Sequence, residues 1–501
     1  MTAWGQVRAL VGLRWRLVRS VSARIGLLAL LALVPLLAWA MIAARTGVEP
    51  AALVAAVEAA PAALLGFGAL AVIAPLTASN GSELVPSSQL VAYPIKPATL
   101  FLSSLVLAPV NLVWIVQLLV LIAETGFLTL GTPSLTRGLI TMGTYVVACT
   151  LVGQALAWLT TGLRASARGR LAIRVVTGVL VVTGLVIARL GRADDLVDQS
   201  YAPRVTRAIA AGGRGDLAQW LPTTGVLAAL AVVAAAAGVA ASRWALRQAP
   251  DRGADRTSRD LRRRGPVDSS YRALLAVDRA SVWRAPALRR GALVLAILPG
   301  IAAAGVGLPW RSLVFLPGLV AAGGGLLFGF NAFCLDGSGA VWVATLPHSP
   351  SLVARAKARV TAEAVFTGVV LAAGIGALRA PGLPTATEAT AILASGSACA
   401  LLVVALCTSS SVRKPYRADL NGPRDAVAPP GAMMLASTRL ALPAAFVGAV
   451  LQAAAIAPQW WVPLAVAAPV MLSSALWIAR SLRRYDQPLV RSRIVQVVSA
   501  G

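Results

Sequence analysis

Residues 225–241 read GVLAALAVVAAAAGVAA and contain no charged and no hydrogen-bonding side chain. A membrane-spanning β-strand would alternate apolar and polar residues, and this run does not alternate. Inside lipid, an α-helix satisfies every backbone N–H and C=O group within its own segment, so it can cross a bilayer without a closed barrel. With its apolar flanks the run is long enough to cross the roughly 30 Å hydrocarbon layer. We therefore predict a spanning helix over 222–242.

Apolar blocks of this kind recur along the whole chain. Of its 501 residues, 58% are hydrophobic and only 13% are charged, and the mean hydropathy is +0.77. Soluble chains keep about a quarter of their residues charged, so the composition excludes a soluble enzyme, a disordered chain and a disulfide-stapled secreted domain. The predicted fold class is all-α, a polytopic membrane protein with about 12 transmembrane helices, at 25–44, 61–79, 98–123, 138–163, 171–189, 222–242, 291–308, 312–334, 360–378, 387–407, 436–456 and 459–479.

The charges predict how the chain is oriented. Its formal net charge is +26, with 45 Lys and Arg residues. If the N-terminus is cytoplasmic, the basic residues outside are only Arg45, Arg137, Arg189, Arg192, Arg204, Arg207, Arg214, Arg311 and Arg379. All the others then lie inside, as the positive-inside rule requires. We expect a multi-pass protein of a bacterial plasma membrane with cytoplasmic N- and C-termini. The basic charge then needs no nucleic-acid partner to explain it.

The sequence also indicates an internal duplication. Residues 7–35 align without a gap with 271–299. Short loop motifs then recur in the same order between corresponding spans, namely Asn80-Gly81-Ser82 with Asp336-Gly337-Ser338 and Pro94-x-x-Pro97 with Pro347-x-x-Pro350. Loop matches are harder to obtain by chance than matches of Leu and Ala. We therefore predict two parallel six-helix repeats.

The repeats define the expected domains. The first half is 1–248, a charged cytoplasmic linker without apolar periodicity is 249–268, and the second half with its cytoplasmic tail is 269–501. Each half begins with a basic amphipathic segment. In the first, the apolar face is Val7, Leu10, Val11, Leu17 and Val18, the opposite face is Arg8, Arg16 and Arg19, and Arg14 intrudes on the apolar side. Such a helix lies in the membrane interface with its arginines near anionic headgroups. A plain topology anchor explains the arginines equally well.

Two cytoplasmic loops differ from the arginine-rich loops around them. They read NGSELVPSSQLVAYPIKP at 80–97 and DGSGAVWVATLPHSP at 336–350, and both are weakly charged and partly apolar. Apolar residues that face water in a loop often mark a partner surface. The alternative is a corner that folds back onto its own helix bundle. The candidate partner-contact residues are Ser82, Leu84, Leu90, Val91, Tyr93, Ser338, Trp342 and Leu346.

This arrangement resembles the membrane subunit of an ATP-binding cassette (ABC) exporter, in the group of six-span permeases that begin with an interfacial elbow helix. In that family the loop between the second and third spans is a coupling helix that docks in a cleft of the ATPase subunit. The resemblance places such helices at Ser82–Tyr93 and Ser338–Leu346. Family members often carry outer helices between spans five and six. Gly191–Trp220 has room for them, whereas the second half has only Ala457–Trp460 there.

The chain carries no ATPase of its own. Gly is never followed by Lys, so the phosphate-binding loop Gly-x-x-x-x-Gly-Lys-Ser/Thr is absent. We expect no enzyme activity, and the resemblance implies two ATP-binding subunits in trans. The apolar interior suggests a small hydrophobic or amphiphilic substrate. The alternative is an ion-coupled secondary transporter of the major facilitator type, although the basic motif usual in that family after span two is absent from Asn80–Pro97.

Few polar residues fall inside the predicted spans. Those that are candidates for a translocation path are Asn111, Gln117, Gln154, Asn331 and Glu363. For the amides, hydrogen bonding between helices is the alternative, and Glu363 is expected to pair with Arg359 four residues earlier. The four cysteines form no Cys-x-x-Cys motif and His348 is the only histidine, so we expect no cofactor, metal site or catalytic residues.

Overall fold

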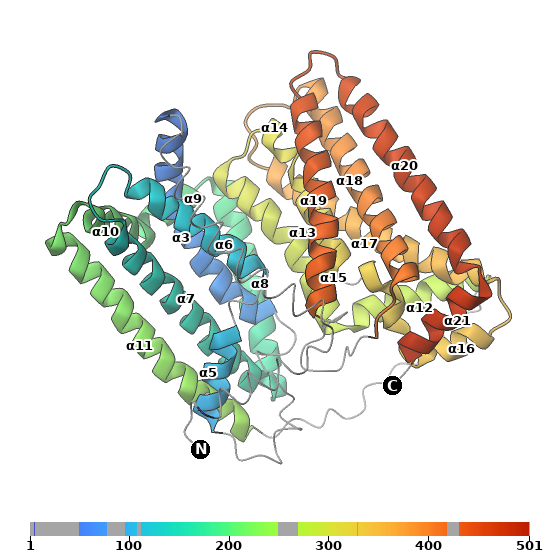
Figure 1. The fold of residues 1–501 in the computed structure, drawn as a ribbon, viewed down its shortest axis with the longest axis horizontal. Helices are drawn as coiled ribbons and strands as arrows, with labels where there is room; N and C mark the ends of the chain where they lie inside the picture. Colours follow the sequence, from blue (N-terminus) through green and yellow to red (C-terminus); the bar gives the residue numbers. More distant parts are fainter. Residues whose placement is uncertain are drawn as a thin grey trace. The chain divides into compact units, whose positions relative to one another are not determined.

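The computed structural model describes residue 5 and residues 50–77, 96–107, 112–248, 269–327, 329–417 and 430–499. Within these ranges every regular element is a helix and no strand occurs (Figure 1), so the all-α prediction is confirmed for them. Eight helices there are long and apolar enough to cross a membrane: Leu135–Arg164, Ala167–Leu190, Leu217–Arg247, Trp310–Asp336, Pro350–Ala377, Ala386–Arg413, Leu435–Ala454 and Val462–Tyr485. The chain is therefore a polytopic helical membrane protein.

These eight helices overlap eight of the predicted spans. Two further predicted spans, 61–79 and 291–308, largely overlap the shorter apolar helices Val57–Ile73 and Gly291–Val306. The predicted span 98–123 is matched less well, because two described helices, Pro97–Leu107 and Leu112–Leu128, fall in this region and the apolar stretch Gln117–Leu128 overlaps only its end. The first predicted span, 25–44, lies outside the described residues. Span boundaries also differ: α17 (Pro350–Ala377) starts before the predicted 360, and α18 (Ala386–Arg413) continues past the predicted 407. A helix can continue past its apolar block where its end is solvated. The total of twelve spans stays a prediction, because the first predicted span lies outside the described residues and three of the apolar helices are short.

The chain divides into two compact units. Unit 1 comprises Met1–Leu180 and Asp194–Ala254, and unit 2 comprises Val181–Ala193 and Asp255–Gly501. The second part of the fifth predicted span thus groups with unit 2, which the sequence did not indicate.

Unit 1 is built around two long helices that pack along each other, α7 and α11. Its described helices are α3 (Pro50–Thr77), α5 (Pro97–Leu107), α6 (Leu112–Leu128), α7 (Leu135–Arg164), the first part of α8 (Ala167–Leu190), α9 (Ala193–Gln199), α10 (Ala202–Arg214) and α11 (Leu217–Arg247). Leu64, Leu121 and Ile209 are fully buried in its main core. Gly238 of α11 lets the Phe101 ring approach, since a Cβ there would lie 2.2 Å from ring atoms.

The segment between α8 and α11 contains two helices, α9 and α10. Val205 and Ile209 of α10 are completely buried, and α10 packs on α7 and α11. The helix ends at Gly215, whose φ of +86° favours glycine. Helices therefore do occur in the segment Gly191–Trp220. In unit 2, α19 ends at Ala454 and α20 begins at Val462, so the corresponding connection is short, as expected.

Unit 2 is centred on α18, which is buried along most of its length. Besides the second part of α8, its described helices are α12 (Ser270–Arg284), α13 (Pro286–Val306), α14 (Trp310–Leu313), α15 (Leu316–Leu327), η4 (Gly329–Asp336), α16 (Gly339–Thr345), α17 (Pro350–Ala377), α18 (Ala386–Arg413), α19 (Pro430–Ala454), α20 (Val462–Tyr485) and α21 (Pro488–Ser499). The buried residues of α18 are mostly small, such as Ala391, Ala398 and Cys407. Small residues let membrane helices approach closely.

Candidate functional site

The candidate site is the surface of α16, the short helix between η4 and α17. The chain turns into it at Gly337, whose φ is +49°. Leu346 ends the helix in an extended conformation, and Pro350 begins α17. His348 folds back so that its Nε2 lies 3.0 Å from the carbonyl oxygen of Val343, near the C-terminus of α16. The second of the two predicted coupling segments is thus a helix between two sharp turns.

The outer face of α16 is apolar and exposed. Trp342 is 76% exposed, Leu346 is 53% exposed and Val341 is 47% exposed. Ser338 precedes the helix and is exposed too. Ala340, by contrast, is buried against the rest of unit 2. A largely exposed indole on a helix outside the apolar spans is a feature of partner surfaces, because Trp buries more apolar area than other side chains on binding.

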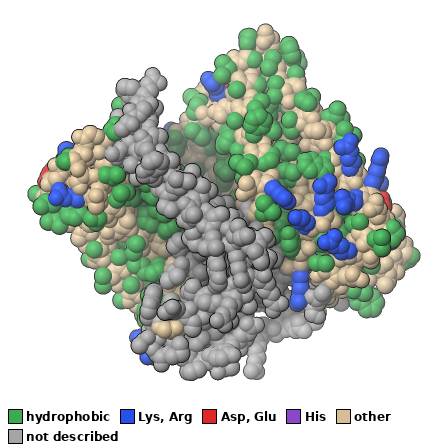
Figure 2. All heavy atoms as spheres, in the orientation of Figure 1, with side chains coloured by type: hydrophobic (Ala, Val, Ile, Leu, Met, Phe, Trp, Pro, Cys, Tyr) green, Lys and Arg blue, Asp and Glu red, His purple; other side chains and the backbone are tan. Residues whose placement is uncertain are grey.

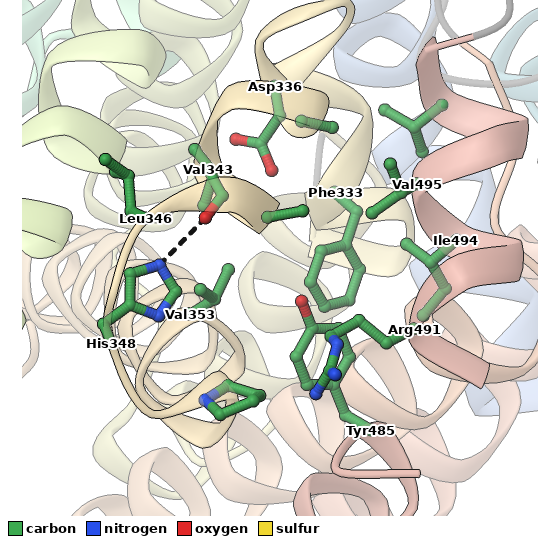
Figure 3. Close-up of a pocket in the computed structure, with 14 residues that line it drawn as sticks. Phe333, Asp336, Val343, Leu346, His348, Val353, Tyr485, Arg491, Ile494 and Val495 are labelled. Atoms are coloured by element: carbon green, nitrogen blue, oxygen red, sulfur yellow. Dashed lines mark hydrogen bonds between the residues drawn. The ribbon is translucent and has the colours of Figure 1, made fainter. Parts of the chain in front are cut away.

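The inner face of α16 rests on the C-terminal helix α21. Ile494 and Val498 of α21 are buried, and they border a cavity of about 180 Å³ with Val343 (Figure 3). Beside them the rings of Phe333 and Tyr485 stack at a centroid distance of 5.0 Å. From the sequence, this end of the chain is expected to be a cytoplasmic tail. The spacing of Val490, Ile494 and Val498, each four residues apart, is the signal that predicts a packed helix face.

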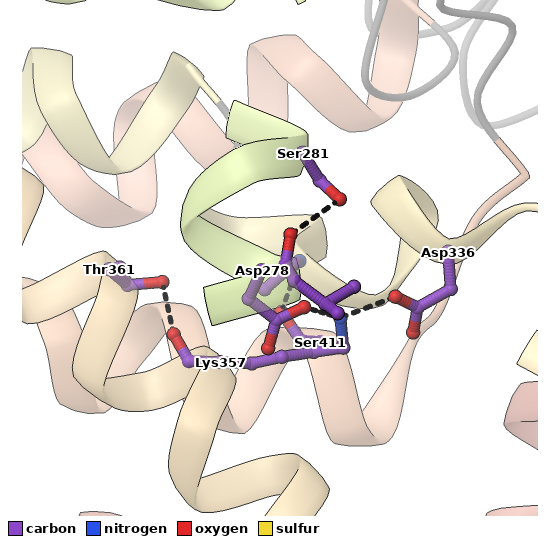
Figure 4. Close-up of polar contacts among 8 residues, drawn as sticks. Asp278, Ser281, Asp336, Lys357, Thr361 and Ser411 are labelled. Carbon is purple, nitrogen blue, oxygen red and sulfur yellow. Dashed lines mark hydrogen bonds and ion pairs between the residues drawn. The ribbon is translucent and has the colours of Figure 1, made fainter. Parts of the chain in front are cut away.

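A buried charge cluster anchors the residues that precede α16. Lys357 Nζ of α17 lies 2.9 Å from Asp278 Oδ1 of α12 and 2.7 Å from Asp336 Oδ1 of η4 (Figure 4). The Lys357 side chain is only 3% exposed. Burial raises the pKa of the Asp278 carboxyl, while the Lys357 ammonium opposes that rise. The cluster therefore ties the amphipathic helix α12 and the start of α16 to one spanning helix.

A second ionic contact lies next to this cluster. Arg279 donates to both carboxylate oxygens of Glu363, at 2.8 Å and 2.7 Å, and Arg359 Nε lies 2.9 Å from Glu363 Oε1. The predicted pair of Arg359 and Glu363 is therefore present. The contact between Arg279 and Glu363 was not predicted, because 84 residues separate the two. Asp278 and Arg279, which are adjacent in α12, thus bind Lys357 and Glu363 of α17.

The other polar candidates occupy separate places. Asn331 is fully buried; its Nδ2 donates to the Tyr416 carbonyl at 2.8 Å, and its Oδ1 accepts from the Tyr416 amide at 3.2 Å. The Asn331 side chain thus joins η4 to the segment that follows α18. Gln117 of α6 is half-buried. The Oε1 atom of Gln154 in α7 is buried and accepts no hydrogen bond from the described residues.

Several predicted positions lie outside the described residues. They include the first amphipathic segment, the linker 249–268, and the candidates Ser82, Leu84, Leu90, Val91, Tyr93 and Asn111. In the part of the chain that is described, no group of three His, Cys, Asp or Glu side chains could hold a metal ion. Cys149, Cys334, Cys399 and Cys407 are free thiols, and burial of the last three fits a packing role.

Comparison with known proteins identifies no relative: no protein family, no curated protein and no solved structure matches the chain.

Proposed function

We propose that the chain is the permease subunit of an ATP-driven ABC exporter. The observation that carries this proposal is the exposed apolar face of α16 around Trp342, on a helix braced by α21 and by the Lys357 cluster. An exposed tryptophan on a rigid support suits a docking element that has to transmit force. Two ATP-binding subunits in trans would supply the ATP hydrolysis, because the chain has no phosphate-binding loop.

Helix packing in the two units supports the proposed duplication. In unit 1 the most extensive packing joins α7 and α11, which correspond to the predicted fourth and sixth spans. In unit 2 it joins α18 and α20, the corresponding pair. The preceding pairs correspond as well, since α3 packs on α6 and α7, and α15 packs on α17 and α18. Two six-span repeats are expected to pack equivalent spans against equivalent partners. A total of twelve spans would fit this arrangement.

The geometry suggests how docking would act on the spans. A push on Trp342 passes through α16 to Asp336, and from there through Lys357 to α12 and α17. These contacts are short and buried, so the parts would move together instead of deforming. Rocking of one half against the other would then open a central path alternately to each side. A small hydrophobic or amphiphilic substrate fits the apolar character of the chain.

The test is copurification of an ATPase subunit with the tagged full-length chain from detergent. We expect Trp342→Glu, and Leu90→Glu in the other loop, to abolish copurification, because a charge has to be desolvated in the docked state. The matched control is Leu383→Glu, since Leu383 is 92% exposed but lies in the connection between α17 and α18.

Two outcomes would count against the proposal. One is unchanged copurification with both docking variants. The other is substrate movement by the chain alone in proteoliposomes, driven by an ion gradient without ATP. The second result would favour the major facilitator alternative.

A further inference from the structure

A basic groove lies at the end of unit 2 where α18 and α20 finish and α19 starts. It consists of two cavities, of about 570 Å³ and about 440 Å³, that share Ser409, Arg413 and Trp477. The larger lies mainly between α18 and α19, and the smaller lies between α18 and α20. Because these helices are membrane-spanning candidates, their ends lie near the lipid headgroups.

Five cations line the groove. Arg413, Lys414 and Arg439 border the larger cavity, and Arg413, Arg480 and Arg484 border the smaller one. Within the described ranges no Asp or Glu lines either cavity, and these five side chains form no ion pair there. Figure 2 shows Lys and Arg side chains gathered on this face of unit 2, over α19 and α20. Like charges around one groove repel one another, so an anion bound among them is favoured.

The wall of the larger cavity is apolar next to these cations. Leu435 and Leu442 of α19 are 46% and 65% exposed, and Leu406 and Pro443 complete the wall. A soluble anion gains nothing from such a surface, whereas an acyl chain covers it. A phospholipid carries its phosphate and its acyl chains side by side at the depth where spanning helices end. The lining therefore favours a lipid over a soluble phosphate.

We propose that this groove binds an anionic phospholipid, with phosphate oxygens at the arginines and an acyl chain along Leu435 and Leu442. Arg413 borders both cavities, so a headgroup with two phosphates, one in each cavity, matches the five cations better than a single phosphate. A lipid of the cardiolipin type is the expected best ligand. The groove shares no residue with the α16 surface, so this proposal does not depend on the proposed function.

The test uses the full chain, purified in detergent and stripped of lipid. Native mass spectrometry measures binding of cardiolipin, of phosphatidylglycerol and of zwitterionic phosphatidylcholine, and competition by inorganic pyrophosphate. We expect affinity to fall in that order of lipids. Arg413→Gln is expected to weaken cardiolipin binding about fivefold, and the double variant Arg480→Gln/Arg484→Gln about 25-fold. All three arginines are exposed, so these variants should fold.

The matched control is Arg483→Gln. Arg483 lies beside Arg484 on α20 and is exposed, but it borders neither cavity. Unchanged cardiolipin binding in this control, with loss in the two groove variants, supports the site. Equal loss of cardiolipin binding in the control and the groove variants would show that any surface cation contributes as much as the groove cations do. This result would overturn the proposal. Displacement of cardiolipin by pyrophosphate at equal concentration would overturn it as well, because the site would then belong to a soluble anion.

Discussion

The ammonium of Lys357 lies 2.7 Å from the carboxylate of Asp336, and the two side chains are 3% and 12% exposed. Asp336 ends η4 and stands three residues before α16, so this contact fixes the start of the candidate docking helix to α17. Asp278 supplies the second carboxylate, at 2.9 Å. Burial of one cation between two anions is stable only as a set, because any member left alone is a desolvated, unpaired charge.

The first prediction concerns that set. Lys357→Met leaves two buried carboxylates facing each other, and we expect the free energy of unfolding to fall by about 3–5 kcal/mol. Thermal unfolding of the purified chain in detergent measures the change. Arg355→Met is the matched control, because Arg355 lies on the same helix but is exposed, and it should alter stability by less than about 0.5 kcal/mol. Equal destabilisation by both variants would contradict the burial argument.

The second prediction is a pH dependence that arises from Asp278. Burial raises the pKa of its carboxyl in the folded state, so the folded chain binds this proton at a higher pH than the unfolded chain does. Where the folded state holds more protons, stability increases as pH falls. We therefore expect the stability of the wild type relative to Asp278→Asn to increase as pH drops through the folded-state pKa. The gain should level off near pH 4, the ordinary pKa of aspartate.

Melting temperatures of the two proteins, measured side by side from pH 7 to pH 4, test this sign. Asp486→Asn is the matched control, since it removes one carboxylate at an exposed position. A difference that moves against the wild type on acidification would show that the Lys357 attraction outweighs burial at Asp278.

A contrasting prediction applies to the neighbouring ion pair. The Arg279 and Glu363 side chains are 50% and 28% exposed, so the protein desolvates this bidentate pair far less than it desolvates Lys357. Arg279→Gln should therefore lower the free energy of unfolding by less than about 1 kcal/mol. The same thermal unfolding assay compares it directly with Lys357→Met. A loss as large as that of Lys357→Met would mean that this pair, too, is effectively buried.

Local patterns in the sequence predicted local structure well. The helix predicted over 222–242 is part of α11, and the amphipathic segment before the seventh predicted span is α12. The pair Arg359 and Glu363 was predictable because four residues along a helix form one turn. Contacts between distant segments carried no such signal: Lys357 lies 79 residues from Asp278, and a sequence does not say which charges meet after folding.

The C-terminal helix is the clearest feature that sequence analysis missed. The basic residues after α20 directed attention to orientation, whereas Ile494 and Val498 of α21 are buried and α21 packs against α16. We expect Ile494→Ala to leave a cavity there and to cost about 2–4 kcal/mol of stability. Limited proteolysis should then cut near α16 faster than in the wild type. Leu489→Ala is the control, because Leu489 is 85% exposed on the same helix.

The last prediction tests the packing of unit 1 with two glycines of one helix. A Cβ at Gly238 would lie 2.2 Å from the Phe101 ring, whereas a Cβ at Gly225 would meet nothing within 4 Å. Gly238→Ala should therefore destabilise the chain by about 1–3 kcal/mol through overpacking. Gly225→Ala should be neutral or slightly stabilising, because alanine favours the helix. Both changes add the same methyl group to α11, so helix propensity cancels in the comparison and only the contact with α5 remains. Similar melting temperatures for the two variants would mean that α5 is free to move away from α11.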